Sequence, residues 1–256
     1  MGFVKPNIIW ERAVEAGLHK IKLSLTSQLT LGFLGGAYIS IGFLLYVRVS
    51  ASFPAAWSEI GGWMGALFFP LGLILTLLAG GELLTGNMMA VPAAYFCRKI
   101  PLRALLQNWL VITIGNFIGA LCVAYAFGHL LGLTEHGIYA DKVIKLVHAK
   151  LDEPFILALV SGIGCNWLVS LAVWLSYGAE DGIGKIAGIW LPTMAFVALG
   201  FQHVVANMFI IPAAIFAGRF TWMDYLYNFI PVYIGNALGG AIFVAGVYGL
   251  VYQRKG

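Results

Sequence analysis

Long apolar stretches, separated by short polar breaks, dominate the chain. A helix of roughly 20 apolar residues crosses a bilayer core, so stretches of this length predict transmembrane helices. Two of the stretches are longer than one straight span requires, namely those at 60–97 and 186–218. The full set covers residues 29–47, 60–97, 104–133, 154–177, 186–218 and 225–253.

Both long stretches carry polar residues near their centres. The first contains Gly80-Gly81-Glu82, and the second contains Gly200-Phe201-Gln202-His203. Each stretch is either a tight hairpin of two spans or a single helix broken inside the membrane. A broken helix needs a water-filled cavity or protein partners for its free backbone groups.

The first 28 residues predict an amphipathic helix that lies in the membrane interface before the first span. Charged residues such as Glu11 and Lys20 interrupt any signal-peptide core. We therefore divide the chain into an interfacial helix (1–28), a six-span channel domain (29–253) and a cytoplasmic tail (254–256). The apolar face contains Trp10, Ala13, Val14, Gly17, Leu18 and Ile21, and the polar face contains Glu11, Arg12, Glu15, His19 and Lys22.

Composition supports a membrane protein. Hydrophobic residues make up 61% of the chain and charged residues 10%, against about 45–50% and 25% in soluble domains. This excludes a soluble globular protein and a disordered one. No basic run is interleaved with aromatic residues, so we expect no nucleic-acid partner. The three scattered cysteines predict neither a disulfide framework nor a metal site.

The distribution of Lys and Arg orients the chain. With six spans and both termini in the cytoplasm, the cytoplasmic side collects twice as many of these residues as the outer side, as the positive-inside rule requires. The cytoplasmic set is Lys5, Arg12, Lys20, Lys22, Arg98, Lys99, Arg103, Lys185, Arg254 and Lys255, and the outer set is Arg48, Lys142, Lys145, Lys150 and Arg219.

The sequence repeats itself at an offset of 120 residues. Residues 87–96 read NMMAVPAAYF and residues 207–216 read NMFIIPAAIF, and the register continues to Asn116 and Asn236. Three spans in each half make the second copy enter the membrane upside down, and inverted repeats with discontinuous helices build transport sites at the midplane. We therefore predict an all-α membrane protein of six transmembrane helices, arranged as two inverted three-helix repeats with broken helices 2 and 5.

Glu82 is the only acidic residue well inside an apolar stretch. A charge at the bilayer centre costs at least about 2.5–3.5 kcal/mol, so it usually has a partner. We expect Glu82 to hold the bent segment up to Asn87, either by accepting backbone N–H groups or by pairing with a cytoplasmic Lys or Arg. The alternative is a solvated carboxylate near the membrane surface.

His203 lies in the break of the second long stretch and is a candidate to line a pore. A neutral imidazole both donates and accepts a hydrogen bond, so it can bind a small anion or exchange a proton. Its alternative role is to satisfy the broken backbone. Four other polar residues near midplane depth can orient the loops or contact a solute, and they are Thr85, Asn166, Gln202 and Asn207. For Asn116 and Asn236 we favour structural hydrogen bonding.

Lys150 precedes the fourth span beside Asp152 and Glu153. It is either a solvated loop lysine or a positive charge that attracts anions to a pore mouth. The apolar residues near the breaks are packing residues by default, and the pattern alone does not single them out as gates. They are Phe69, Leu73, Leu83, Leu84 and Phe196.

The sequence has no nucleophile–base set, no metal-ligand spacing and no phosphate-binding glycine loop of the P-loop type. We therefore expect neither an enzyme nor a cofactor.

These motifs resemble the formate/nitrite transporter family over essentially the whole chain. The resemblance rests on Gly81-Glu82-Leu83-Leu84-Thr85-Gly86-Asn87, on Gly200-Phe201-Gln202-His203-Val204-Val205-Ala206-Asn207-Met208, on Cys165-Asn166-Trp167-Leu168-Val169 with Leu171-Ala172-Val173-Trp174, and on Gly36-Ala37-Tyr38-Ile39-Ser40.

The resemblance implies an aquaporin-like homopentamer in the bacterial plasma membrane, in contact with lipid and with one pore in each protomer. The substrates it implies are small monovalent anions: formate, nitrite, hydrosulfide, acetate or lactate. It makes His203 the central pore histidine, Asn166 its neighbour, Lys150 the vestibule lysine and Thr85 part of the bent loop. It also makes Leu73 and Leu83 the cytoplasmic-side constriction, and Phe69 and Phe196 the outer one.

Two positions depart from the family pattern. Gln202 stands where many formate channels have Glu, which removes a charge beside the histidine. Leu84 stands where Phe is common, which widens or softens a constriction. Both departures bear on the substrate and leave the predicted fold unchanged.

Charge decides how an anion crosses. Moving a carboxylate-sized ion into a low-dielectric region costs several kcal/mol even after relaxation. Protonating a carboxylate of pKa about 3.5 at pH 7 costs roughly 5 kcal/mol. Our hypothesis is that Lys150 concentrates the anion, which then gains a proton from His203 or through water and passes as the neutral acid. The alternatives are an aquaporin-like channel for neutral solutes, although Asn87 and Asn207 do not begin the Asn-Pro-Ala motif, and a membrane assembly protein without a pore.

Overall fold

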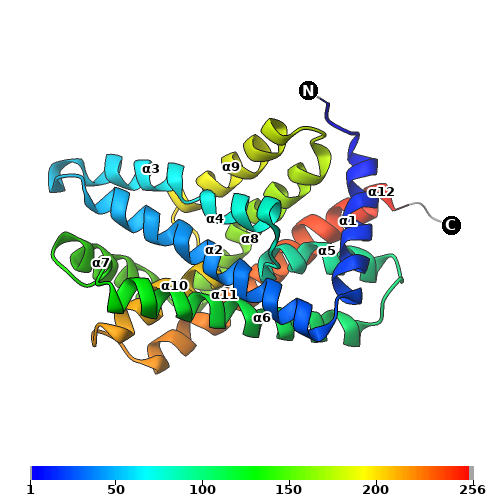
Figure 1. The fold of residues 1–256 in the computed structure, drawn as a ribbon. Helices are drawn as coiled ribbons and strands as arrows, with labels where there is room; N and C mark the ends of the chain where they lie inside the picture. The colour runs from blue at the N-terminus through cyan, green and yellow to red at the C-terminus, as the bar shows by residue number, and fades with distance from the viewer. Residues whose placement is uncertain (1, 254–256) are drawn as a thin grey trace.

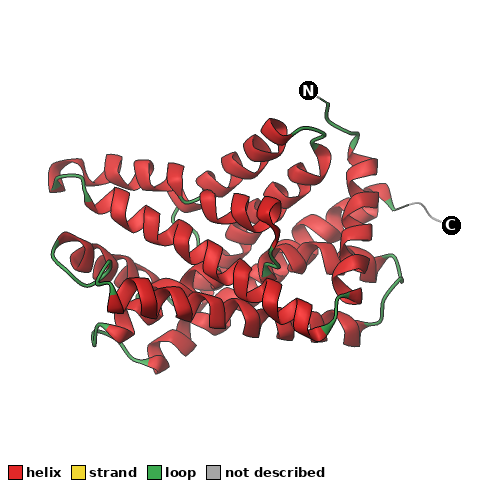
Figure 2. Cartoon of the chain, in the orientation of Figure 1, coloured by secondary structure: helices red, strands yellow, loops and turns green. Residues whose placement is uncertain are grey.

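The computed structural model describes residues 2–253, and within this range the molecule is built from helices and connecting loops (Figure 2). The expected tail at 254–256 lies outside the described residues. In chain order the elements are α1 (Pro6–Lys22), α2 (Leu25–Ala51), η1 (Ala55–Trp57), α3 (Ser58–Phe68), α4 (Leu71–Ile74), η2 (Leu75–Gly80), α5 (Leu84–Phe96), α6 (Leu102–Val123), η3 (Ala124–Leu130), α7 (Ile138–Leu151), α8 (Phe155–Gly178), α9 (Gly182–Ala198), α10 (Val204–Phe216), α11 (Trp222–Gly240), η4 (Ala241–Gly246) and α12 (Val247–Tyr252).

Within residues 2–253, five helical stretches are long and apolar enough to cross a membrane. Two shorter apolar helices, α9 and α10, accompany them. The first span begins at Leu25, earlier than the expected start at 29, because Ser24 caps the helix by accepting the N–H of Ser27. The five stretches are Leu25–Ala51, Ala55–Gly80, Leu102–Leu130, Phe155–Gly178 and Trp222–Tyr252.

Both long stretches are interrupted helices rather than hairpins. The first break (residues 81–83) follows Gly80, which has φ +98°, and the second break (residues 199–203) contains Gly200 at φ +75°. Positive φ is cheap only for glycine, so these two residues let the chain leave helical geometry. In Figure 1, α5 extends toward the end of the molecule where Gly2 and Gln253 lie, whereas α10 extends toward the opposite end, beside α7.

Helix pairs pack closely where glycine removes the side chain. A Cβ on Gly115 of α6 would lie 3.0 Å from the Cα of Gly32 in α2. The same contact recurs between α11 and α8, where a Cβ on Gly235 would lie 3.0 Å from the Cα of Gly162. Small residues are typical of such contacts in membranes, because they let helix backbones approach.

The apolar face of α1 is covered by protein. Trp10, Ala13 and Val14 are buried, and a Cβ on Gly17 would collide with the carbonyl oxygen of Ala90 in α5. Arg12 also donates a hydrogen bond to the carbonyl oxygen of Tyr177 at the end of α8, 2.7 Å away. The predicted amphipathic pattern is thus present, but its partners are α5 and α8 instead of lipid, and the helix ends at Lys22, before residue 28.

Candidate functional site

Two asparagines anchor the two breaks in the same way. The Oδ1 of Asn116 accepts the N–H of Leu84, the first residue of α5, at 2.9 Å. Its Nδ2 donates to the carbonyl oxygens of Glu82 and Gly32. Each broken helix exposes backbone groups that lack intrahelical partners, and an amide side chain supplies both a donor and an acceptor for them.

Asn236 repeats this arrangement at the second break. Its Oδ1 accepts the N–H of Val204 at 2.9 Å, and its Nδ2 donates to the carbonyl oxygens of Gln202 and Gly162. The structural role predicted for Asn116 and Asn236 is therefore what their contacts show.

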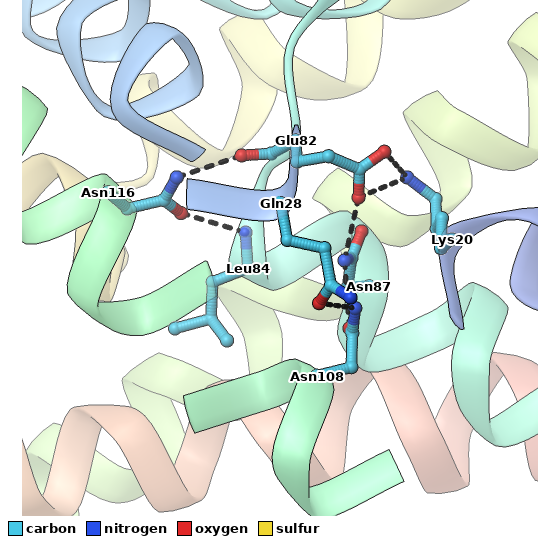
Figure 3. Close-up of polar contacts among 7 residues, drawn as sticks. All are labelled: Lys20, Gln28, Glu82, Leu84, Asn87, Asn108 and Asn116. Carbon is cyan, nitrogen blue, oxygen red and sulfur yellow. Dashed lines mark hydrogen bonds and ion pairs between the residues drawn. The ribbon is translucent and has the colours of Figure 1, made fainter. Parts of the chain in front are cut away.

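The first break is closed by an ion pair (Figure 3). Glu82 is buried, and its carboxylate oxygens lie 2.8 and 2.9 Å from the Nζ of Lys20 on α1. Asn87 also donates to Glu82, at 2.8 Å, and to Asn108, which in turn donates to Gln28. Glu82 thus has the lysine partner that the sequence suggested. Asn87 binds Glu82 across the same bent segment and so holds this segment in place.

The second break carries the corresponding network without the carboxylate. Asn207 donates to the Oε1 of Gln202 at 2.7 Å and to Asn228 at 2.8 Å. Asn228 then donates to the carbonyl oxygen of Lys150. Asn207 was a candidate for contact with solute, but its side-chain contacts are those of Asn87, since both bind the loop preceding their helix.

A cavity of about 160 Å³ lies against the second break and is lined in part by His203. We call it the His203 cavity. Its polar lining is contributed by α7, by the turn after it and by the second break. The residues that line it are Phe43, Tyr46, Phe69, Leu146, Ala149, Lys150, Glu153, Phe196, Val197, Gly200, Phe201, Gln202, His203 and Ala206.

Aromatic rings form a continuous wall of this cavity. The rings of Phe69 and Phe196 meet edge to face with centroids 5.5 Å apart. Phe43 contacts Phe69 at 5.6 Å, and Phe196 stacks on the imidazole of His203 at 5.5 Å. Phe69 and Phe196, which the resemblance made the outer constriction, thus lie in the apolar wall that reaches His203.

The contacts of His203 define its tautomer. Its Nδ1 accepts the N–H of Ala206 at 3.0 Å, which caps α10. A backbone N–H can only donate, so Nδ1 carries no proton and the neutral ring holds its proton on Nε2. Nε2 lies 3.0 Å from the Oγ1 of Thr85, at the start of α5. The imidazole therefore joins the two broken helices through a hydrogen bond in which Nε2 donates.

Asn166 lies beneath this contact. Its Nδ2 donates to the carbonyl oxygens of Thr85 and Asn236, at 3.2 and 2.7 Å. It is a near neighbour of the Thr85–His203 pair, as predicted, but it does not line the His203 cavity. Leu73, Leu83 and Leu84 do not line it either, and all three are buried in the core.

Lys150 lies at the end of α7 and faces the cavity. Its Nζ is 3.5 Å from the Oε1 of Gln202 and 5.9 Å from the centroid of the Phe43 ring. Burial lowers the pKa of Lys150 to about 8, while the nearby Glu153 acts in the opposite direction. Lys150 therefore remains largely protonated at neutral pH. Because the buried ammonium has lost part of its hydration, an anionic partner would stabilise it.

Several residues of the site were not predicted from sequence. Phe43 and Tyr46 lie within the first predicted span and carried no prediction, and Glu153 was noted only as a carboxylate beside Lys150. Lys20 was noted only as a charge of the N-terminal segment on the cytoplasmic side. The amide of Asn108, which matches Asn228 in the repeat, was the one available signal for the network around Glu82.

Within residues 2–253, the protein thus combines five helical stretches able to cross a membrane with a cavity that is lined in part by the buried His203. The family model described as "Formate/nitrite transporter" matches residues 7–250. The chain belongs to the formate/nitrite transporter family. Its similar proteins are transporters and channels, not enzymes.

Relatives and solved structures agree with this family. The chain is 59% identical to the "Uncharacterized transporter YrhG" of Bacillus subtilis, over 100% of this chain and 96% of the relative. It is 54% identical to the "Formate channel BtFdhC" of Bacillus thuringiensis, over 100% and 98%. A solved "Pentameric formate channel with formate bound" is 29% identical, with a TM-score of 0.79 over 90% of this chain and 98% of that one.

Proposed function

We propose that the protein conducts formate, or a similar small monovalent anion, across the bacterial plasma membrane, with protonation of the anion at His203. The observation that carries this proposal is that His203 and Lys150 line one cavity together with the contacting rings of Phe69 and Phe196. The other candidates are nitrite, hydrosulfide, acetate and lactate.

The cavity residues provide the steps of such a passage. Lys150 attracts the anion and offsets part of its desolvation. The aromatic wall then favours a neutral species, since a bare carboxylate loses its hydration there. The imidazole of His203 borders that wall, because Phe196 stacks on the ring. The proton comes either from His203 or from water that reaches it.

The proposed arrangement in the membrane is six spans in two inverted halves, with both termini in the cytoplasm and five protomers in the assembly. The matched contacts of Asn116 and Asn236 support the repeat. The name of the similar pentameric formate channel supports the assembly. Exposed apolar side chains along α6, such as Leu106, Leu110 and Ile118, provide surface for lipid or a neighbouring protomer.

The test is formate uptake by purified protein in vesicles as a function of pH. His203→Asn is the sharpest variant, because a side-chain oxygen at this position still caps α10 while the ring proton is lost. We expect formate flux to fall by at least about tenfold, since each 1.36 kcal/mol lost slows passage tenfold. The rise of flux at acid pH should also disappear.

Two controls complete this experiment. His148→Ala removes an exposed histidine of α7 and should leave the flux unchanged. Fluxes of nitrite, hydrosulfide and acetate rank the substrates, and glycerol swelling tests the neutral-solute alternative. A His203→Asn protein with the flux and pH dependence of the natural chain would refute the role of the histidine.

A further inference from the structure

Glu153 occupies a position in the His203 cavity that the proposed mechanism does not use. It lies on the turn between α7 and α8 and lines this cavity together with Lys150. The same two residues also line a second cavity of about 330 Å³, beside Asp224 and Tyr227 of α11. Lys150 and Glu153 therefore stand between the two spaces, and their combined charge acts on both.

Gln202 holds this pair in place. Its Nε2 donates to the Oε2 of Glu153 at 3.0 Å and to the carbonyl oxygen of Lys150 at 3.1 Å. Its Oε1 accepts from Asn207 and lies 3.5 Å from the Nζ of Lys150. Every donor of the Gln202 amide is used, so this side chain positions its neighbours and has no free N–H for a solute.

The side chains at positions 153 and 202 are complementary in hydrogen bonding and in charge. A carboxylate at 202 has no hydrogen to donate, so it could not bind Glu153 and would place two negative groups about 3 Å apart. An amide at 202 with a carboxylate at 153 satisfies both groups. The chain thus carries one negative charge in this pair, and it is located at residue 153.

We propose that Glu153 is a counter-charge of Lys150 and sets how strongly the His203 cavity attracts an anion; this inference rests on the proposed function. The charge of the Glu153 carboxylate and that of the Lys150 ammonium sum to zero. Without the carboxylate, the ammonium is uncompensated and captures anions more strongly.

The groups around Glu153 are few. From α7 and the turn they are Lys150, Asp152 and the exposed His148, and from the second break they are Gln202 and His203. From α11 they are Asp224, Tyr227 and Asn228. Asp152 points to solvent beside His148, with a side chain that is 74% exposed. It is therefore a matched control, since it is a carboxylate one residue away and outside the cavity.

The experiment measures the formate concentration for half-maximal uptake at neutral pH. Glu153→Gln keeps an acceptor for the Nε2 of Gln202 and removes only the charge. We expect it to lower the half-saturating concentration roughly three- to tenfold. Asp152→Asn should behave like the natural chain.

The double variant Glu153→Gln with Gln202→Glu moves the charge to the other partner and should bring the half-saturating concentration back toward that of the natural chain. A purely structural role for Glu153 would not produce this rescue. The inference is overturned if Glu153→Gln keeps the natural half-saturating concentration, or if Asp152→Asn changes it equally. Absence of formate flux in the natural protein would instead refute the proposed function, so the two failures are distinguishable.

Discussion

At the first break Glu82 forms a buried ion pair with Lys20, whereas at the second break the corresponding residue is Gln202, which is neutral. The backbone anchors and the Asn–Asn pairs are the same in both. The first break is covered by α1, and the second opens to the His203 cavity. One scaffold is thus used twice: the break with Glu82 is covered by the helix that carries Lys20, whereas the break with Gln202 borders a cavity.

The anchors shared by both breaks should give the largest effect. Asn116→Ala and Asn236→Ala each remove three buried hydrogen bonds. At about 1–2 kcal/mol for each group left unpaired, we expect a loss of roughly 3–6 kcal/mol in the free energy of unfolding. Thermal unfolding in detergent measures it, with the exposed Ile118→Ala on α6 as the control. If Asn116→Ala lost stability and Asn236→Ala did not, the two breaks would have the same geometry but would not contribute equally to the free energy of unfolding.

The ion pair that distinguishes the breaks should give an intermediate effect. Glu82→Gln makes the first break resemble the second and leaves the ammonium of Lys20, with a side chain only 14% exposed, without its partner. Breaking a buried pair costs about 3–5 kcal/mol, and the remaining exposure reduces this to roughly 2–3 kcal/mol. The double variant Lys20→Met with Glu82→Gln should recover part of the loss in the same unfolding assay. If Glu82→Gln were as stable as the natural protein, the ion pair would not contribute to closing this break.

The two glycines should give the smallest effect. Gly80 and Gly200 have positive φ, and a Cβ on either would meet no atom within 4 Å. Replacement by Ala therefore costs only backbone strain, about 1–2 kcal/mol in the unfolding assay. Gly62, where φ is not positive and the space is equally open, is the control. If the losses in the free energy of unfolding for Gly80→Ala and Gly200→Ala differed by more than about 1–2 kcal/mol, one of the two breaks would be more rigid than the other.

Much of the scaffold could be predicted from sequence. Gly80-Gly81-Glu82 lies near the centre of the first long stretch, and the repeat at an offset of 120 residues places polar residues at the corresponding position of the second. Polar groups at matching positions of two copies indicated that both helices are interrupted there. For Asn116 and Asn236, which match in the same repeat, the prediction was structural hydrogen bonding without named partners. Their contacts now show that each satisfies the first N–H of the following half-helix.

The partners of the site could not be predicted in the same way. Periodicity indicates which face of α1 is apolar, but it does not reveal that this face packs on α5 and thereby brings Lys20 to Glu82. Phe43 and Tyr46 line the cavity only because α2 lies beside α10. Hydrophobic patterns do not distinguish a wall of a cavity from a packed core, since both bury the same residue types.

The contact between Thr85 and His203 has a consequence for cations. It brings together the first residues of α5 and α10, so the amino ends of two half-helices converge on one point. Each helix carries about half a positive elementary charge at that end, arising from its aligned peptide dipoles. A sodium or potassium ion there would meet two positive poles and no nearby carboxylate among the residues that contact His203. The backbone itself therefore disfavours a cation at this contact, independently of any titrating side chain.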